Sequence, residues 1–258
     1  YFEAEHSPFL ERLIGASLVH FQDAEVYIAA GESDVKEDQW WENEYLDVRT
    51  ASYRHYRESI DNIIVSRCER HAAGRTQTRI AELCAGDGAL AEKLLSRLPN
   101  ISEYLGLDRN ETLVERANAR LNVAIAKNIV LGAESQDGSQ LIATAGTFDI
   151  WIASGSILCY QVGHHDSAPA ILKAMASSLT GEGIIIITGF TQSRLEPKLL
   201  DACRLEVVEA SVPSPEAGGL ESGFSRFHFF VLRKRGAGSG HEEPEASIRN
   251  NLRKLMLS

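Results

Sequence analysis

Residues 80–91 are the most informative segment of the chain and read Ile80-Ala81-Glu82-Leu83-Cys84-Ala85-Gly86-Asp87-Gly88-Ala89-Leu90-Ala91. We expect a strand to end near Glu82, a glycine turn to follow it, and a helix to begin near Ala89. Glycine suits such a turn because it adopts positive φ readily and, having no Cβ, lets a ligand lie against the main chain. The N–H groups and the dipole at the start of the helix favour an anionic group such as a carboxylate or a phosphate. The segment therefore predicts a ligand-binding loop.

A second acidic position follows the glycine loop. The run Tyr104-Leu105-Gly106-Leu107-Asp108 predicts a strand that ends on a carboxylate, twenty positions after Gly88. In an α/β sheet, a carboxylate at this place accepts hydrogen bonds from ribose hydroxyls. Gly86, Gly88 and Ala91, together with Asp108, also satisfy the dinucleotide-binding fingerprint. These residues alone therefore leave two classes of cofactor open.

Strand and helix patterns alternate from about residue 78 to residue 235. We expect strands at 79–83, 104–107, 128–131, 148–153, 183–188, 205–210 and 227–233, and helices at about 90–98, 111–124, 168–179 and 194–203. Such alternation predicts an α/β fold with a doubly wound, mostly parallel seven-stranded sheet covered on both faces. The strands at 205–210 and 227–233 are joined by the turn-rich segment 213–219, which predicts an antiparallel hairpin at the edge of the sheet, with the last strand antiparallel.

The residues around the glycine turn resemble the first motif of the class I S-adenosylmethionine-dependent methyltransferases. That motif reads acidic residue, three residues, Gly, any residue, Gly, and Glu82 to Gly88 fit it. A nicotinamide-binding turn more often has an apolar residue at the position of Glu82, because a carboxylate repels a pyrophosphate. S-adenosylmethionine carries an amino group and a sulfonium, so acidic residues such as Glu82 and Asp87 suit it. The predicted hairpin is also similar to the family's sheet, and the resemblance covers roughly residues 45–235.

The resemblance implies S-adenosylmethionine as cofactor, with S-adenosylhomocysteine as the product. It implies that the cofactor is bound by Tyr45, Tyr53, Glu82, Cys84, Gly86, Gly88, Asp108, Arg109, Ala133, Glu134 and Ser154. Tyr45, Arg49 and Tyr53 are candidates for contact with its methionine end. Two positions depart from the family pattern. Cys84 replaces a common glycine, and Ala133-Glu134 stands where the family has an acidic residue followed by Ala near the adenine.

The loop after the expected fourth strand holds the candidate catalytic residues, His164 and His165. Methyl transfer from a sulfonium needs mainly alignment of the reactants. It needs a general base only where the acceptor must lose a proton. Either histidine is a candidate base, and the alternative is that both are solvated loop residues beside a helix cap formed by Asp166-Ser167. We expect no metal site, because adjacent side chains rarely converge on one ion.

The chain divides by composition into three predicted zones. We expect a helical N-terminal cap or lid at 1–77, the cofactor-binding core at 78–235 and a flexible C-terminal tail at 236–258. Helical stripes are expected from Leu10 to Val19 and from Tyr53 to Ile64. Ten of the 19 aromatic residues lie within residues 1–56. They suit either a lid that excludes water from the cofactor or the apolar filling of a cap.

Charge and composition restrict the partners. The formal net charge of −10 and the absence of a Lys/Arg stripe argue against nucleic acid. No apolar run is long enough to cross a membrane, no signal peptide is expected, and four cysteines without a CxxC pair suit the cytosol. The patterns predict no particular oligomeric state. Three functions remain: methyl transfer to a small-molecule O or N acceptor, an NAD(P)-dependent oxidoreductase, and a non-catalytic cofactor-binding relative.

Overall fold

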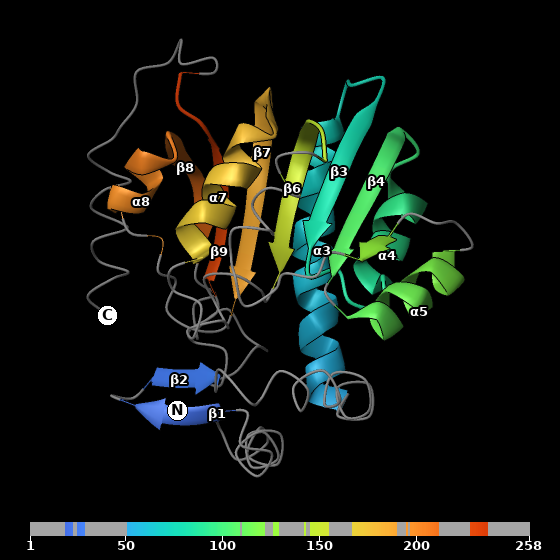
Figure 1. Ribbon diagram of the computed structural model, residues 1–258. Helices are drawn as coiled ribbons and strands as arrows, with labels where there is room; N and C mark the ends of the chain where they lie inside the picture. Colours follow the sequence, from blue (N-terminus) through green and yellow to red (C-terminus); the bar gives the residue numbers. More distant parts are fainter. Residues whose placement is uncertain are drawn as a thin grey trace.

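The computed structural model describes a seven-stranded sheet flanked by helices, together with a separate two-stranded hairpin (Figure 1). The described residues are 19–22, 25–28, 51–108, 110–121, 126–128, 142, 145–154, 167–189, 195, 197–211 and 228–236. The strands are β1 (Val19–Gln22), β2 (Glu25–Ile28), β3 (Thr78–Leu83), β4 (Ile101–Asp108), β5 (Ala126–Asn128), β6 (Phe148–Ser154), β7 (Leu179–Gly189), β8 (Leu205–Ser211) and β9 (His228–Lys234). The helices are α3 (Ala51–Ala72), α4 (Ala89–Arg97), α5 (Glu111–Leu121), α7 (Ser167–Ser177) and α8 (Pro197–Ala202).

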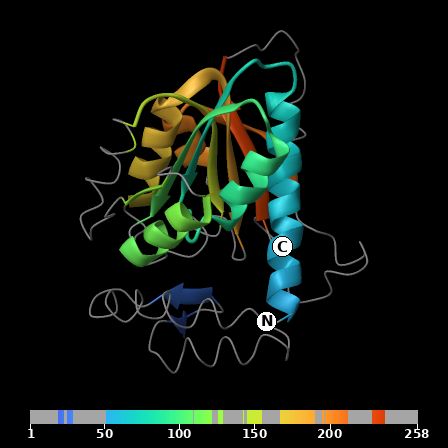
Figure 2. The ribbon, with the colours of Figure 1, turned by 90° about the vertical axis from the view of Figure 1, so that its right-hand side faces the viewer.

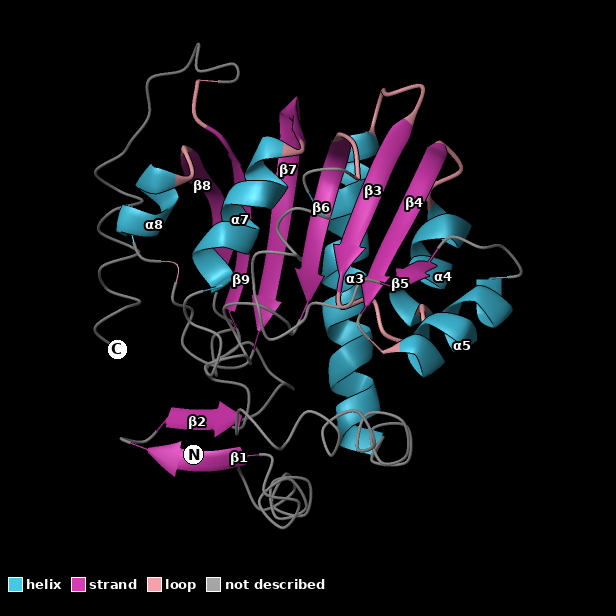
Figure 3. Cartoon of the chain, viewed as in Figure 1, coloured by secondary structure: helices cyan, strands magenta, loops and turns pink. Residues whose placement is uncertain are grey.

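The strand order of the main sheet is β5-β4-β3-β6-β7-β9-β8 (Figure 3). Strands β3 to β7 are parallel to their neighbours in this group, and β9 runs antiparallel between β7 and β8. The predicted α/β class and mostly parallel sheet are confirmed. After β3, the chain adds β4 and β5 on one side of that strand. It then returns to add β6 and β7 on the other side, so the strand order reverses between β3 and β6. Ligands bind beside the carboxyl ends of the strands at such a switch point.

Each central strand contributes to two separate cores, because successive side chains of a strand point to opposite faces of the sheet. On β6, Ile150 and Ile152 pack toward α3 and α4, whereas Trp151 and Ala153 pack toward α7 and α8. The predicted central run Ile184–Ile187 on β7 divides in the same way and is buried throughout. The view along the sheet shows the helices as layers on its two faces (Figure 2).

The N-terminal zone departs from the helical prediction at residues 19–28. These residues form the antiparallel pair β1–β2, in which Val19 lies opposite Ile28 and Phe21 opposite Val26. The alternation of apolar residues at these four positions has the period of a strand, and β-branched and aromatic side chains favour that conformation. The helix predicted through Tyr53 and the residues after it is present as α3. The rest of residues 1–50 lies outside the described residues.

The other boundaries agree with prediction to within a few residues. The third strand was expected at 128–131, whereas β5 covers Ala126–Asn128, and the residues directly after it lie outside the described residues. Strand β7 begins at Leu179, earlier than expected, because Leu179 pairs with Phe148 before a register shift in the ladder. Among the described helices, none combines the length and the apolar character that crossing a lipid bilayer requires.

Candidate functional site

The loop between β3 and α4 has an unusual backbone. Cys84, Gly86 and Gly88 have φ values of 56°, 58° and 76°, in the left-handed region. The N–H of Ala85 donates to the carbonyl of Leu107 at 3.1 Å, which ties the loop to the end of β4. Left-handed φ at a non-glycine residue such as Cys84 is costly, and strain of this kind clusters at binding sites. The loop lies at the switch point where the fold places ligands.

The two glycines of the loop serve different purposes. A Cβ added at Gly86 would meet no atom within 4 Å, so this residue faces open space. A Cβ added at Gly88 would lie 3.0 Å from the Cβ of Ala117 on α5. Gly88 is also the N-cap of α4. Gly86 therefore leaves the main chain accessible, whereas Gly88 allows α5 to pack closely against the loop.

Asp108, the last residue of β4, holds the loop in place. One of its carboxylate oxygens accepts a hydrogen bond from the N–H of Gly86 at 2.8 Å, and the other accepts one from the N–H of Asn110 at 2.9 Å. The Asn110 side chain in turn accepts the N–H of Leu113 at 2.9 Å and caps α5. The structure thus brings together Gly86 and Asp108, which the sequence predicted separately as site residues. The direct bond between them was not predicted.

The acidic residue between the two glycines is held by an arginine. Arg120 on α5 donates from Nη2 to the carboxylate of Asp87 at 2.7 Å and from Nε to the Asp87 carbonyl at 3.0 Å. The acidic character of Asp87 was expected to suit the cofactor, and its contact with Arg120 was not predicted. No motif in the sequence points to Arg120, because its place beside Asp87 follows from the packing of α5 against Gly88.

Glu82 lies inside the core between the sheet and the α3–α4 layer and is only 1% exposed. It accepts a hydrogen bond from the hydroxyl of Tyr104 on β4. Burial and the neighbouring Glu82 carboxylate raise the pKa of Tyr104 well above its usual range. The same two causes, in the same order, raise the pKa of the Cys68 thiol on α3. Tyr104 therefore remains a neutral donor to Glu82 at all physiological pH values.

The carboxyl ends of β6 and β7 carry a second polar contact. The hydroxyl of Thr188 donates to the Ser154 hydroxyl at 2.9 Å, and both side chains are buried. Tyr53 lies in the first turn of α3, which projects beyond the carboxyl ends of the parallel strands (Figure 1). Within the described part of the chain, no three potential ligands gather to hold a metal ion. The remaining predicted residues lie outside the described residues, and these are Tyr45, Arg49, Arg109, Ala133, Glu134, His164 and His165.

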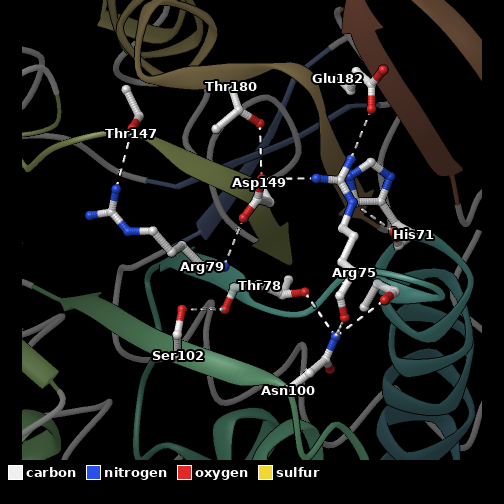
Figure 4. Close-up of polar contacts among 11 residues, drawn as sticks. His71, Arg75, Thr78, Arg79, Asn100, Ser102, Thr147, Asp149, Thr180 and Glu182 are labelled. Atoms are coloured by element: carbon white, nitrogen blue, oxygen red, sulfur yellow. Dashed lines mark hydrogen bonds and ion pairs between the residues drawn. The ribbon is translucent and has the colours of Figure 1, made fainter.

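A further polar cluster lies at the opposite, amino end of the sheet (Figure 4). The carboxylate of Asp149 accepts hydrogen bonds from the N–H of Arg79 at 2.9 Å, from the guanidinium of Arg75 at 3.2 Å and from the hydroxyl of Thr180 at 3.1 Å. Asn100 donates to the carbonyl of Arg75 at 3.1 Å and to other acceptors nearby. These contacts join the starts of four strands. Because ligands bind at the other end of such a sheet, we interpret this cluster as structural.

The family model described as a methyltransferase domain matches residues 80–183, which run from β3 through the glycine loop to β7. The chain therefore carries a methyltransferase domain over residues 80–183. The cofactor of this methyltransferase is S-adenosylmethionine, and the glycine loop fits it: Gly86 leaves open space, α4 begins directly after the loop, and a carboxylate closes the second strand. No curated protein matches the sequence.

Solved structures share the fold of the methyltransferase at low sequence identity. One is a putative sarcosine dimethylglycine methyltransferase from Galdieria sulphuraria, with 13% identity and a TM-score of 0.54 over 79% of this chain and 98% of that one. Another is an S-adenosylmethionine-dependent methyltransferase from Leishmania major, with 15% identity and a TM-score of 0.53 over 77% of this chain and 82% of that one. A third comes from Clostridium acetobutylicum, with 12% identity and a TM-score of 0.51 over 79% of this chain and 99% of that one.

Proposed function

We propose that this methyltransferase methylates an oxygen or a nitrogen atom of a small molecule. The observation that carries the proposal is the glycine loop at the switch point, braced by Asp108 through Gly86. The net charge of −10 opposes the approach of nucleic acid, which favours another class of acceptor. An acidic surface also suits an acceptor that carries an amine.

We assign the cofactor to the carboxyl edge of β3, β4 and β6. Gly86 gives access to the main chain, Gly88 allows α5 to pack against the loop, and Asp108 is the acceptor for the ribose hydroxyls. Glu82, Cys84 and Ser154 border the same edge. Tyr45, Tyr53, Arg109, Ala133 and Glu134 are proposed to complete the site. When bound, S-adenosylmethionine supplies a methyl group on a sulfonium, which needs no further activation by the protein.

The residues of the chain then have the task of orienting the acceptor and controlling its proton. An alcohol or phenol must lose its proton to become nucleophilic, and we propose His164 or His165 as the base. For an amine that arrives neutral, no base is required. Replacing each histidine by Gln and measuring kcat against pH tests this role. If neither replacement changes the profile, these histidines are not the base.

The division into a cap at 1–77, a core at 78–235 and a tail at 236–258 is also proposed. Helix α3 falls within the first of these zones, yet its Ile60, Ile64 and Cys68 are buried against the sheet. We infer that the cap includes this helix as a fixed support, and that residues before it are the candidates for a lid.

Calorimetric titration with S-adenosylmethionine, S-adenosylhomocysteine and NADH tests the assignment of the cofactor site. Gly86→Ala and Gly74→Ala form a matched pair, because both positions have positive φ and open space around the missing Cβ. Each replacement carries the same backbone cost, but only Gly86 lies in the loop. We expect both adenosyl ligands to bind, NADH to remain silent and Gly86→Ala alone to lose affinity. Binding of NADH alone would support an oxidoreductase instead.

The acceptor is tested by following a labelled methyl group into fractions of small metabolites, protein and RNA. Incorporation into the small-molecule fraction is the expected result. Label found only in protein or RNA would overturn the proposed acceptor class while leaving the methyltransferase assignment intact. A protein that binds the cofactor and labels no fraction would favour the non-catalytic alternative.

A further inference from the structure

Arg120 joins three parts of the molecule around the glycine loop. Two of its nitrogens bind Asp87, one at the carboxylate and one at the main-chain carbonyl. The third, Nη1, lies 3.2 Å from the carboxylate of Glu92 on α4. The side chain of Arg120 therefore links α5 to the glycine loop, through both the side chain and the main chain of Asp87, and to the first turn of α4.

The position of Arg120 on α5 is fixed by the packing of its neighbour. The Cα of Ala117 would lie 3.2 Å from a Cβ at Gly88, so α5 approaches the loop backbone more closely than a side chain would permit. Residues 117 and 120 are one helical turn apart and share a face. The close approach at Gly88 consequently brings the guanidinium to Asp87.

The charges around the loop explain why a cation is needed there. The side chain of Asp87 is 11% exposed, and that of Glu92 lies nearby on the first turn of α4. Burial acts against the charge on Arg120, but Asp87 and Glu92 outweigh it and raise the pKa of the guanidinium. A buried carboxylate without a cation would be costly, and it would turn toward water or toward the positive groups of the cofactor.

We propose that Arg120 is a positioning residue that holds the glycine loop in its binding conformation by fixing both the side chain and the carbonyl of Asp87. This inference rests on the proposed role of the loop in binding the cofactor. The planar guanidinium can bond a carbonyl and a carboxylate at once, whereas an ammonium is a single point charge. A loop with left-handed φ at Cys84, Gly86 and Gly88 has little intrinsic preference for this shape and depends on such contacts.

The test compares Arg120→Ala, Arg120→Lys, Asp87→Ala and the double variant Asp87→Ala/Arg120→Ala by calorimetric titration with S-adenosylhomocysteine. Arg97→Ala is the matched control, because Arg97 pairs with Glu69 at 2.8 Å on an exposed face of α4. We expect Arg120→Ala to weaken binding roughly tenfold to a hundredfold, Arg120→Lys to weaken it less, and Arg97→Ala to leave it unchanged. Since Arg120 acts through Asp87, the double variant should lose no more than Arg120→Ala alone.

Steady-state kinetics separate positioning from a general loss of structure. Arg120→Ala should raise the KM for S-adenosylmethionine while kcat at saturating cofactor stays within about twofold of the parent. Arg120→Lys, which keeps the charge, covers the case in which the alanine variant fails to fold. Parent-like binding by a folded Arg120 variant, or losses that add in the double variant, would refute the inference. If the parent protein itself fails to bind S-adenosylhomocysteine, the proposed cofactor role of the loop fails as well.

Discussion

Asp108 accepts a hydrogen bond from the main-chain N–H of Gly86 at 2.8 Å, so the end of β4 determines where the glycine loop lies. The same carboxylate accepts the N–H of Asn110 through its other oxygen. It therefore receives main-chain donors from the segment after β3 and from the segment after β4. Asp108, which is expected to bind the ribose, therefore also shapes the loop that is proposed to bind the rest of the cofactor.

Replacing Asp108 by Asn should weaken cofactor binding strongly. An amide offers one oxygen to two N–H donors and places its NH₂ against the second. Hydrogen bonds to a charged group contribute about 1.5–3 kcal/mol, so we expect a loss of affinity of roughly tenfold to a hundredfold. Titration with S-adenosylhomocysteine measures it. Glu103→Gln, on the same strand and exposed, is the control, and equal affinity of the Asp108→Asn variant and the parent would contradict the prediction.

Gly88→Ala should destabilise the fold more than Gly86→Ala does. Both residues have left-handed φ, a conformation that costs a residue with a Cβ about 1–2 kcal/mol. Only at Gly88 does the new methyl also press against Ala117, which adds about 1–3 kcal/mol of overpacking. Urea denaturation gives both free energies of unfolding. Equal losses in the two variants would mean that α5 moves away without cost.

The substitutions Gly183→Ala and Gly181→Ala, both in β7, should have different effects on the free energy of unfolding. A Cβ at Gly183 would lie 2.7 Å from the Leu179 side chain and 2.9 Å from the carbonyl oxygen of Asp149, whereas one at Gly181 meets nothing within 4 Å. We expect Gly183→Ala to lower the free energy of unfolding by about 1–3 kcal/mol. Gly181→Ala should leave it unchanged or raise it by up to about 1 kcal/mol. Thermal unfolding of the pair decides, and a neutral Gly183→Ala would count against the described packing.

His71 should make the fold sensitive to mild acid. Burial, and after it the charge of Arg75, lowers the pKa of His71 in the folded protein. Its Nε2 is buried without a hydrogen-bond partner among the described residues. Well above a typical histidine pKa of about 6.5, the imidazole of His71 is neutral in both the folded and the unfolded state. As the pH falls below that value, the unfolded state takes up a proton that the folded state resists, so the free energy of unfolding decreases.

Urea denaturation of the parent and of His71→Gln at several values between pH 7.5 and about pH 5 measures this effect. The parent should lose stability more steeply than the variant as the pH falls. At the upper end of the range the two slopes should coincide. Parallel curves over the whole range would show that His71 is protonated as readily in the folded as in the unfolded state.

Much of the sheet could be predicted because its signals are local. Apolar runs such as Ile184–Ile187 identify buried strands, and the acidic residue with two glycines identifies the loop. The hairpin β1–β2 was not predicted, and the expected helical stripe ended at its first residue, Val19, because a short apolar pattern fits both a helical and a strand period. Alternation with Phe21 would have favoured the strand.

The contacts that brace the site could not be predicted in the same way. Arg120 and Asp87 are 33 residues apart, and only the packing of α5 at Gly88 brings them together. The hydrogen bond that Glu82 accepts from Tyr104 was not predicted, and the expected role of Glu82 in binding the cofactor stays a prediction. Motif spacing identifies which residues matter, whereas tertiary packing decides what each one touches.

The place of β9 in the sheet has a consequence for how the protein is made. Because β9 is the last of the described strands in the sequence and lies between β7 and β8, both neighbours are synthesised before the strand that joins them. Until β9 arrives, β7 presents an open edge along its apolar Ile184–Ile187 run, and such edges pair readily with other chains. A chain interrupted between the end of β7 at Gly189 and the start of β9 at His228 would therefore keep the whole glycine loop and yet be prone to aggregate.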